Sequence, residues 1–204
     1  MKPVFYVDTG VANLASVTAA FARLGRRRAP ANQRDVDSAD LLVVPGVGNY
    51  GAAARALQHG GLFEALQRRV ESGLPTLGIC LGMQLMCSGS EEAPGVRGIG
   101  ALHGVLRRFP AGVRAPQMGW NRVESSGGLV RDGMAYFANS YALKVAPSPG
   151  WQLAVCRHGV DFVAAAQRGA VLLCQFHPEL SGSFGADLLG GWLAAGAREE
   201  VTPC

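Results

Sequence analysis

The stretch LPTLGICLGMQLM, residues 74–86, determines the fold and the chemistry that we predict for this chain. Its residues 75–79 predict a buried strand, and residues 81–88 predict a helix directly after it. Cys80 lies between them, flanked by Gly78 and Gly82, which allow a sharp turn of the backbone. A lone cysteine in an apolar run is usually a core residue. The spacing G-x-C-x-G instead favours a nucleophile on a strand-to-helix turn, where the helix N-terminus stabilises the thiolate.

Strands and helices alternate on the N-terminal side of this stretch. Residues 3–8 and 40–46 predict buried strands, the first of which breaks at Thr9-Gly10. Between them, apolar residues at three- and four-residue steps predict a helix that ends at Gly25. Residues 51–72 predict a helix split at Gly60-Gly61. Together with residues 75–88, this alternation predicts an α/β fold in which helices cover both faces of a mostly parallel sheet.

From about residue 96 the pattern changes to short strands between turn residues. The candidate strands lie within residues 98–109, 119–125, 134–143, 151–159, 161–169 and 170–176. We expect them to add antiparallel strands to the same core. A last helix is predicted around residues 185–195. Because no linker, repeat or low-complexity segment interrupts the chain, we expect one domain over residues 1–204.

Composition and charge exclude several classes of function. The 204 residues are 49% hydrophobic, which fits a globular chain with one substantial core. The net charge is +4, but no aromatic residues interleave the arginine clusters, so we expect no nucleic-acid partner. We find no signal peptide and no apolar run of about 18 residues, and we expect a cytoplasmic chain without membrane contact. Five cysteines without a CxxC pair predict neither disulfides nor a metal site.

A cysteine nucleophile needs a base, and His177 is the histidine that fits this role best. His59, His103 and His158 have sequence contexts typical of surface or structural histidines. His177 instead closes an apolar strand and begins the sequence HPE. Because Pro178 biases the preceding residue toward extended geometry, His177 and Glu179 are expected to face the same side. We therefore predict a triad of Cys80, His177 and Glu179, with Glu179 orienting the imidazole.

The loop GVGNYG, residues 46–51, matches the dinucleotide-binding pattern G-x-G-x-x-G. Pro45 precedes it, no acidic residue ends a second strand at the expected distance, and the first strand–helix turn, DTGVAN, lacks the pattern. We therefore expect no nucleotide and no other cofactor. The loop is better explained as a source of backbone N–H groups facing a carbonyl near Cys80. We predict an oxyanion hole formed by the N–H groups of Leu81 and Val47.

Together these residues resemble the class I (triad) glutamine amidotransferases. The resemblance spans residues 8–182 and rests on the stretches DTGVANLASV, VPGVGNYGAA, LGICLGMQLM, SEEAPGVRGIG, MGWNRV, YFANSYAL and CQFHPELSG. Within the family, PGVG and MGWN are most similar to the glutaminase subunits that serve imidazole glycerol phosphate synthase in histidine biosynthesis. Several relatives that serve other synthases carry PGG in place of PGVG.

The resemblance implies a flavodoxin-like sheet and hydrolysis of glutamine through a γ-glutamyl thioester on Cys80, with His177 as base and then acid. It also implies a separate cyclase subunit, a (β/α)8 barrel in a 1:1 heterodimer, that receives the ammonia. The glutamine pocket that it implies is formed by Gly48, Gln84, Glu92, Ser140 and Tyr141. Independently of the resemblance, Gln84 is expected one helical turn from Cys80 on the same face.

Three positions depart from the family pattern, which has PHMGWN, HSY and a basic residue after HPE. This chain has Gln117, Asn139 and Leu180 there. We expect all three near the mouth that faces the partner, and we hypothesise that Leu180 packs against an apolar patch of the partner. Trp120 and Tyr136 could be core residues or aromatic anchors of this interface.

Three other functions remain as alternatives. The chain could serve another ammonia-using synthase, such as that for pyridoxal phosphate, although PGVG and MGWN weigh against it. It could be a non-catalytic scaffold, although the intact triad argues against that reading. It could be a cysteine peptidase, but nothing in the sequence suggests an extended cleft for a peptide.

Overall fold

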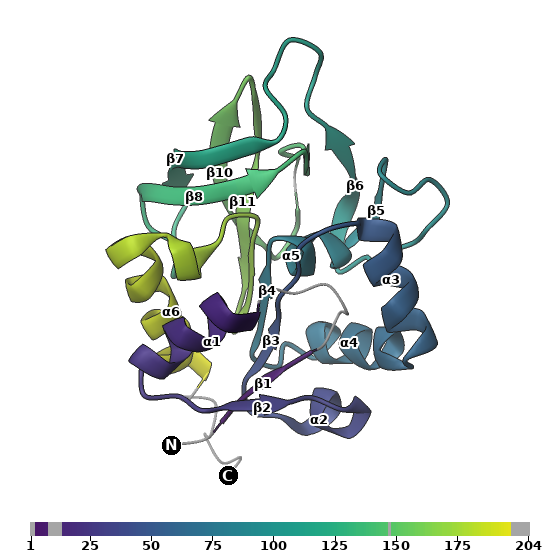
Figure 1. The fold of residues 1–204 in the computed structure, drawn as a ribbon, viewed down its shortest axis with the longest axis vertical. Coiled ribbons are helices and arrows are strands. Elements are labelled where there is room, and N and C mark those ends of the chain that lie inside the picture. The colour runs from purple at the N-terminus through teal and green to yellow at the C-terminus, as the bar shows by residue number, and fades with distance from the viewer. Residues whose placement is uncertain (1–2, 8–13, 147, 197–204) are drawn as a thin grey trace.

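The computed structural model describes residues 3–7, 14–146 and 148–196. Its main sheet has nine strands in the order β2-β1-β3-β4-β12-β11-β10-β7-β8 (Figure 1). The strands are β1 Val4–Tyr6, β2 Arg28–Pro30, β3 Leu42–Val44, β4 Thr76–Ile79, β7 Gln117–Ser125, β8 Gly133–Asn139, β10 Gln152–His158, β11 Val160–Arg168 and β12 Val171–Cys174. A second sheet contains β5 Cys87–Ser90, β6 Leu102–Arg108 and β9 Tyr141–Ala142.

The first five strands of the main sheet run parallel, and the other four continue it in antiparallel pairs. The strand order of the parallel part is that of a flavodoxin-like sheet. The predicted α/β fold class, with a helix-flanked parallel sheet and added antiparallel strands, is therefore confirmed.

Helices cover the parallel sheet on both faces, α1 and α6 on one side and α3 and α4 on the other (Figure 1). The helices are α1 Leu14–Arg23, α2 Gln33–Ser38, α3 Tyr50–His59, α4 Leu62–Glu71, α5 Leu81–Leu85, the 3-10 helix η1 Pro178–Leu180 and α6 Gly182–Gly196. The split of residues 51–72 at Gly60-Gly61 is confirmed, as is the last helix.

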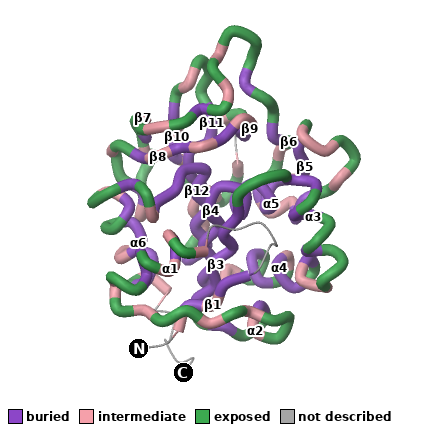
Figure 2. The backbone as a smooth tube through the Cα atoms, viewed as in Figure 1, coloured by how far each residue is buried: buried purple, intermediate pink, exposed green. Residues whose placement is uncertain are grey.

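The alternation of side chains along the central strands explains the two layers of core. In β3, Val43 packs in the cluster under α1 and α6, whereas Leu42 and Val44 pack in the cluster under α3 and α4. Phe21 and Trp192 meet edge to face on the first side. Because both faces of β3, β4 and β12 are covered, these strands are buried along their whole length (Figure 2).

The structure corrects three of the expected elements. The helix predicted over residues 81–88 ends at Leu85, because Cys87 already begins β5 and pairs in parallel with β6. Residues 170–176, expected as an antiparallel addition, contain β12, which pairs in parallel with β4. Its run Val171–Cys174 is apolar throughout, which is typical of a strand buried on both faces. Residues 98–109 contribute β6 to the second sheet rather than to the main one.

The elements β2 and α2 were not predicted from the sequence. The strand β2 lies at the edge of the sheet, is only partly buried and ends at Pro30, so it carries no apolar periodicity. The predicted break at Thr9-Gly10 and the turn DTGVAN lie outside the described residues.

Candidate active site

Cys80 lies between β4 and α5, at the N-cap of the helix, as the sequence predicts. Its φ of 52° makes it the one residue other than glycine with a positive φ in the described part of the chain. Its backbone N–H donates to the carbonyl of Cys174 at 2.7 Å, and its own carbonyl accepts from the N–H of Gln84 at 3.1 Å. These bonds hold Cys80, the predicted nucleophile, on a strained turn at the carboxyl end of a central strand.

The two glycines beside Cys80 are required because three backbone segments approach each other closely there. A Cβ on Gly82 would lie 1.7 Å from the carbonyl oxygen of Val44 in β3. A Cβ on Gly78 would lie 2.9 Å from a methyl group of Leu173 and 3.1 Å from the backbone of α5. The predicted spacing G-x-C-x-G therefore reflects the close packing of α5 against β3 and β4.

His177 and Glu179 form the predicted pair, with 2.8 Å between Nδ1 of the imidazole and Oε1 of the carboxylate. Both side chains are buried. His177 is extended, as the following proline predicts, but Glu179 lies in the 3-10 helix η1. The two side chains therefore meet across a tight turn. The expectation that both residues lie in one extended segment is wrong for Glu179.

The charge of His177 is set by opposing effects. Burial disfavours the imidazolium, but hydrogen bonds to Cys80 and Glu179 and the charges of these two groups outweigh it. Together they raise the pKa of His177 from 6.5 to about 10. The ring is therefore protonated at neutral pH and held between the sulfur and the carboxylate.

A cavity of about 250 Å³ lies beside Cys80. It is lined by Val47, Gly48, Cys80, Leu81, Gln84, Glu92, Pro116, Ala138, Asn139, Ser140, Tyr141 and His177. The structure thus brings together every residue predicted for the nucleophile, the base, the oxyanion hole and the glutamine pocket. Glu179 lies behind His177, and Glu92 also accepts the backbone N–H of Tyr50 at the start of α3.

The predicted oxyanion donors are arranged differently from the expectation. The N–H of Leu81 donates to the carbonyl oxygen of Gly46 at 3.3 Å, so this donor is occupied. The next residue along the loop is Val47, and Gly48 follows with a φ of 99°. The loop GVGNYG therefore lies against Cys80 as predicted, with a carbonyl rather than an N–H facing the Leu81 amide.

The aromatic residues predicted for the partner interface lie on the outer face of β7 and β8. Trp120 and Tyr136 are opposite each other across the two strands, with their rings edge to face at 6.3 Å. Trp120 is 54% exposed and Leu180 is 42% exposed. Met118 and Met134 are exposed on the same two strands. We call Met118, Trp120, Met134, Tyr136 and Leu180 the β7–β8 face.

Gln117 and Asn139, expected near the mouth that faces the partner, are buried. They are paired across β7 and β8, and each is only 4% exposed. Strand alternation turns them to the side opposite Met118 and Trp120, toward the core. Asn139 lines the cavity beside Cys80, whereas Gln117 contacts the sulfur of Cys156. Of the three departures, Leu180 alone is exposed.

Sequence reasoning missed two contributions to this site. Pro116 and Ala138 line the cavity, and Gln175 contacts the sulfur of Cys80. A signal for Gln175 was present, since it is a polar residue in the apolar run AVLLCQF and stands two positions before His177.

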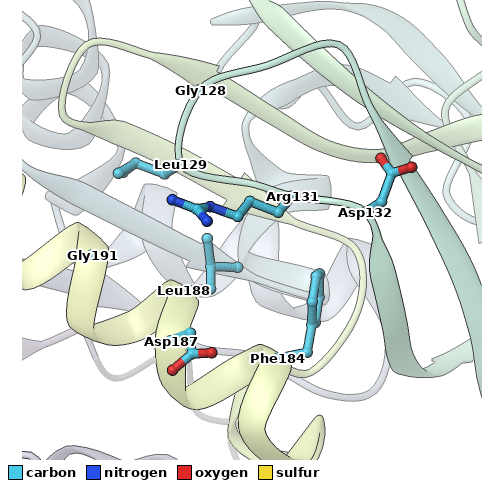
Figure 3. A pocket seen from close by; sticks show the side chains of 8 residues that line it. All are labelled: Gly128, Leu129, Arg131, Asp132, Phe184, Asp187, Leu188 and Gly191. Carbon is cyan, nitrogen blue, oxygen red and sulfur yellow. The ribbon is translucent and has the colours of Figure 1, made fainter.

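A larger cavity of about 410 Å³ lies between α6 and the segment that precedes β8 (Figure 3). Arg131, Asp132 and Asp187 surround an apolar floor that includes Phe184 and Leu188. None of the predicted site residues lines this cavity, and its lining contains no Cys, Ser, Thr or His. Among the described residues, no group of three or more His, Cys, Asp or Glu side chains could hold a metal ion, and no helix is long and apolar enough to cross a membrane.

Comparison with known proteins agrees with the geometry. The family model described as glutamine amidotransferase class-I matches residues 8–189. The chain is 43% identical to the imidazole glycerol phosphate synthase subunit HisH of Deinococcus radiodurans, over 98% of this chain and 94% of that protein. It is 44% identical to a HisH subunit of Thermus thermophilus, over 90% of this chain and 92% of that protein. A solved glutamine amidotransferase shares the fold with a TM-score of 0.76 at 20% identity, covering 95% of this chain and 98% of that one.

Proposed function

Because the chain belongs to the class I glutamine amidotransferase family, we propose that it is the glutaminase subunit of an imidazole glycerol phosphate synthase, which hydrolyses glutamine and delivers ammonia to a cyclase subunit. The observation that carries the proposal is the hydrogen-bonded pair of His177 and Glu179, whose imidazole lines the same cavity as Cys80. The identity to HisH subunits over almost the whole chain supports this choice of synthase.

The reaction follows from these positions. The Cys80 thiolate attacks the carboxamide carbon of glutamine, and the carbonyl oxygen becomes an oxyanion. His177 gives its proton to the departing nitrogen, so that ammonia leaves and a γ-glutamyl thioester remains. The neutral His177 then removes a proton from water, which attacks the thioester. Expulsion of the thiolate releases glutamate and restores the protonated histidine.

The oxyanion hole requires a rearrangement of one peptide unit. The carbonyl of Gly46 and the N–H of Val47 belong to the same trans peptide and point in opposite directions. With the carbonyl bonded to the Leu81 N–H, the Val47 N–H faces away from it. Rotation of this peptide frees the Leu81 N–H and turns the Val47 N–H toward the oxyanion, which completes the pair of donors. Gly48, already at a positive φ, provides the adjacent hinge.

We also propose that the cyclase is a (β/α)8 barrel that binds one copy of this chain, and that it docks on the β7–β8 face. Exposed aromatic and methionine side chains are enriched in protein interfaces, and this face continues to Leu180, next to Glu179. The chain acts as a single domain. A cytoplasmic location is consistent with the four described cysteines, all of which are free thiols.

The function is tested by measuring glutamate release from glutamine. The chain is assayed alone, with a histidine-pathway cyclase subunit, and with that subunit plus its phosphoribulosyl ligand. We expect strong release in the full mixture. Release that ignores the cyclase would keep the glutaminase chemistry and reassign the partner. No release from a complex shown to form would favour the scaffold reading.

Removal of the Glu179 carboxylate should slow turnover strongly. In Glu179→Gln the imidazole loses the partner that orients it and stabilises its charge, so we expect kcat in the complex to fall by about 10²- to 10⁴-fold. The pKa of His177 should fall as well. A wild-type rate in this variant would remove Glu179 from the triad.

The same pair makes stability depend on pH. Because the folded pKa of His177 lies above 6.5, its contribution to the free energy of unfolding is complete below pH 6.5 and is lost as the pH rises through about 10. The stability difference between wild type and Glu179→Gln, measured by urea unfolding, should therefore shrink between about pH 6 and about pH 10.

Truncation of Trp120 should weaken the complex with the cyclase. For Trp120→Ala we expect Kd to rise by about 10- to 100-fold, because exposed aromatic anchors carry much of an interface's binding energy. Val105→Ala is the matched control, since Val105 is similarly exposed but lies on β6. Leu180→Lys should also weaken binding, and tighter binding would contradict an apolar contact at this position. Titration calorimetry measures all three.

A further inference from the structure

Gln175 is a fully buried polar residue that contacts the reacting sulfur. Its side chain is 0% exposed, and its Nε2 donates to Sγ of Cys80 at 3.8 Å. Its Oε1 accepts from Nε2 of Gln84 at 3.0 Å. A buried amide with both ends bonded is a fixed element of the site rather than an incidental neighbour.

The orientation of this amide follows from its partners. The carbonyl of Tyr141 can only accept a hydrogen bond, and it receives one from Nε2 of Gln84 at 3.3 Å. The same Nε2 faces Gln175, which must therefore present its oxygen to Gln84. The Nε2 of Gln175 is then the atom that faces the sulfur. The direction of the chain of hydrogen bonds is thus set by a backbone carbonyl.

Gln175 and His177 hold the sulfur from two positions of the same segment. Phe176 between them is buried in the core cluster under α6, so the two flanking side chains turn the other way, toward Cys80. The sulfur therefore has a protonated imidazole as one partner and a neutral amide donor as another. Hydrogen-bond donors bind an anionic sulfur more strongly than a neutral one.

Gln84 connects this arrangement to the cavity. It lines the cavity beside Cys80, and its Oε1 has no hydrogen-bond partner among the described residues. An acceptor at this position suits an N–H of bound glutamine. A donor on the substrate that engages Gln84 Oε1 would polarise the amide and strengthen the donors behind it.

We propose that Gln175 is a positioning residue for the glutaminase reaction: its amide holds the Cys80 sulfur as a thiolate and couples it, through Gln84, to the occupied glutamine pocket. The proposal rests on the function proposed above. The bond to sulfur is strongest when the sulfur is an anion, so it acts at rest and again when the thiolate is expelled from the thioester. No atom is transferred to or from Gln175.

The test measures the protonation state of the Cys80 sulfur separately from the rate of glutamine turnover. The titratable groups around Cys80 are His177, Glu179 behind it, Glu92 and Tyr141 in the lining of the cavity, and Cys174 in the adjacent strand. All remain in Gln175→Met, which keeps the length of the side chain and removes its polar atoms. Gln67→Met, on the partly exposed surface of α4, is the matched control.

Two quantities are measured for each protein. The first is the rate of Cys80 alkylation by iodoacetamide as a function of pH, without glutamine. The second is kcat and KM for glutamine in the complex with the cyclase and its ligand. For Gln175→Met we expect the alkylation midpoint to rise by about one pH unit and kcat to fall about 10- to 100-fold, with KM changed less than kcat. Gln67→Met should match wild type in both.

Alkylation needs no turnover, so failure of the glutaminase function and failure of this role give different results. An unchanged alkylation profile and an unchanged kcat in Gln175→Met would overturn the proposal, as would a fall in folded protein without a shift of the profile. If Gln175→Met does not fold, Gln175→Glu decides the question. It keeps the shape and the acceptor for Gln84 but places a carboxylate oxygen at the sulfur, and it should raise the midpoint further. An unchanged midpoint there would refute the role.

Discussion

Cys80→Ala is expected to lower glutamine hydrolysis in the complex by about 10⁴-fold or more, with little effect on folding. The thioester cannot form without the sulfur, and no other nucleophile lines the cavity at the position of Cys80. Alanine fits the space of the cysteine. Synthase activity supplied with ammonium salt should persist, because the cyclase then receives ammonia without the glutaminase.

Cys87→Ala is the matched control for this loss. Cys87 is also buried, but it lies on the far side of α5, where its Sγ contacts the carbonyl of Met83 and burial raises its pKa to about 12. Its glutaminase rate should stay within about twofold of wild type, which is the scale expected for a change away from the reacting atoms. Glutamate release measured with and without ammonium salt tests both variants. If Cys80→Ala kept its glutaminase rate, the nucleophile assignment would be wrong.

Gly82→Ala is expected to destabilise the chain by about 4 kcal/mol or more and to abolish glutaminase activity. The new Cβ would lie 1.7 Å from the carbonyl oxygen of Val44, and a backbone atom cannot move aside as a flexible side chain can. Either α5 separates from β3 or the turn at Cys80 changes shape. Both outcomes displace the sulfur from His177.

Gly190→Ala supplies the comparison for this substitution. Gly190 lies in α6, and nothing lies within 4 Å of a Cβ added to it. Alanine there should change the free energy of unfolding by no more than about 1 kcal/mol, on the stabilising side. Urea unfolding of both variants measures the effect. Equal stability of Gly82→Ala and Gly190→Ala would mean that α5 does not pack against β3 as described.

Much of the fold and the site could be predicted because the signals are local. The turn at Cys80 shows in the spacing of two glycines, and the pair His177–Glu179 shows in three consecutive residues. Apolar runs and helical periods gave β3, β4, α3 and α4. These features depend on neighbours in the chain, so a single sequence contains the information for them.

The remaining features depend on partners distant in the sequence. The parallel pairing of β12 with β4 joins segments that are far apart in the chain. An apolar run in the sequence does not indicate which strand will pair with it. Gln175 needs Gln84 and Cys80 in place before its role is visible. The burial of Gln117 and Asn139 follows from the register of β7 against β8, which the family pattern alone did not give.

The position of β12 also has a consequence for synthesis of the chain on the ribosome. The strands β11, β10, β7 and β8 join the first half of the sheet only through β12, one of the last elements to be translated. A nascent chain that has not reached residue 174 therefore lacks both the strand that joins its two halves and His177, the proposed base that follows it. A chain that ends between residues 80 and 177 carries Cys80 without the proposed base His177, and we expect it to hydrolyse no glutamine.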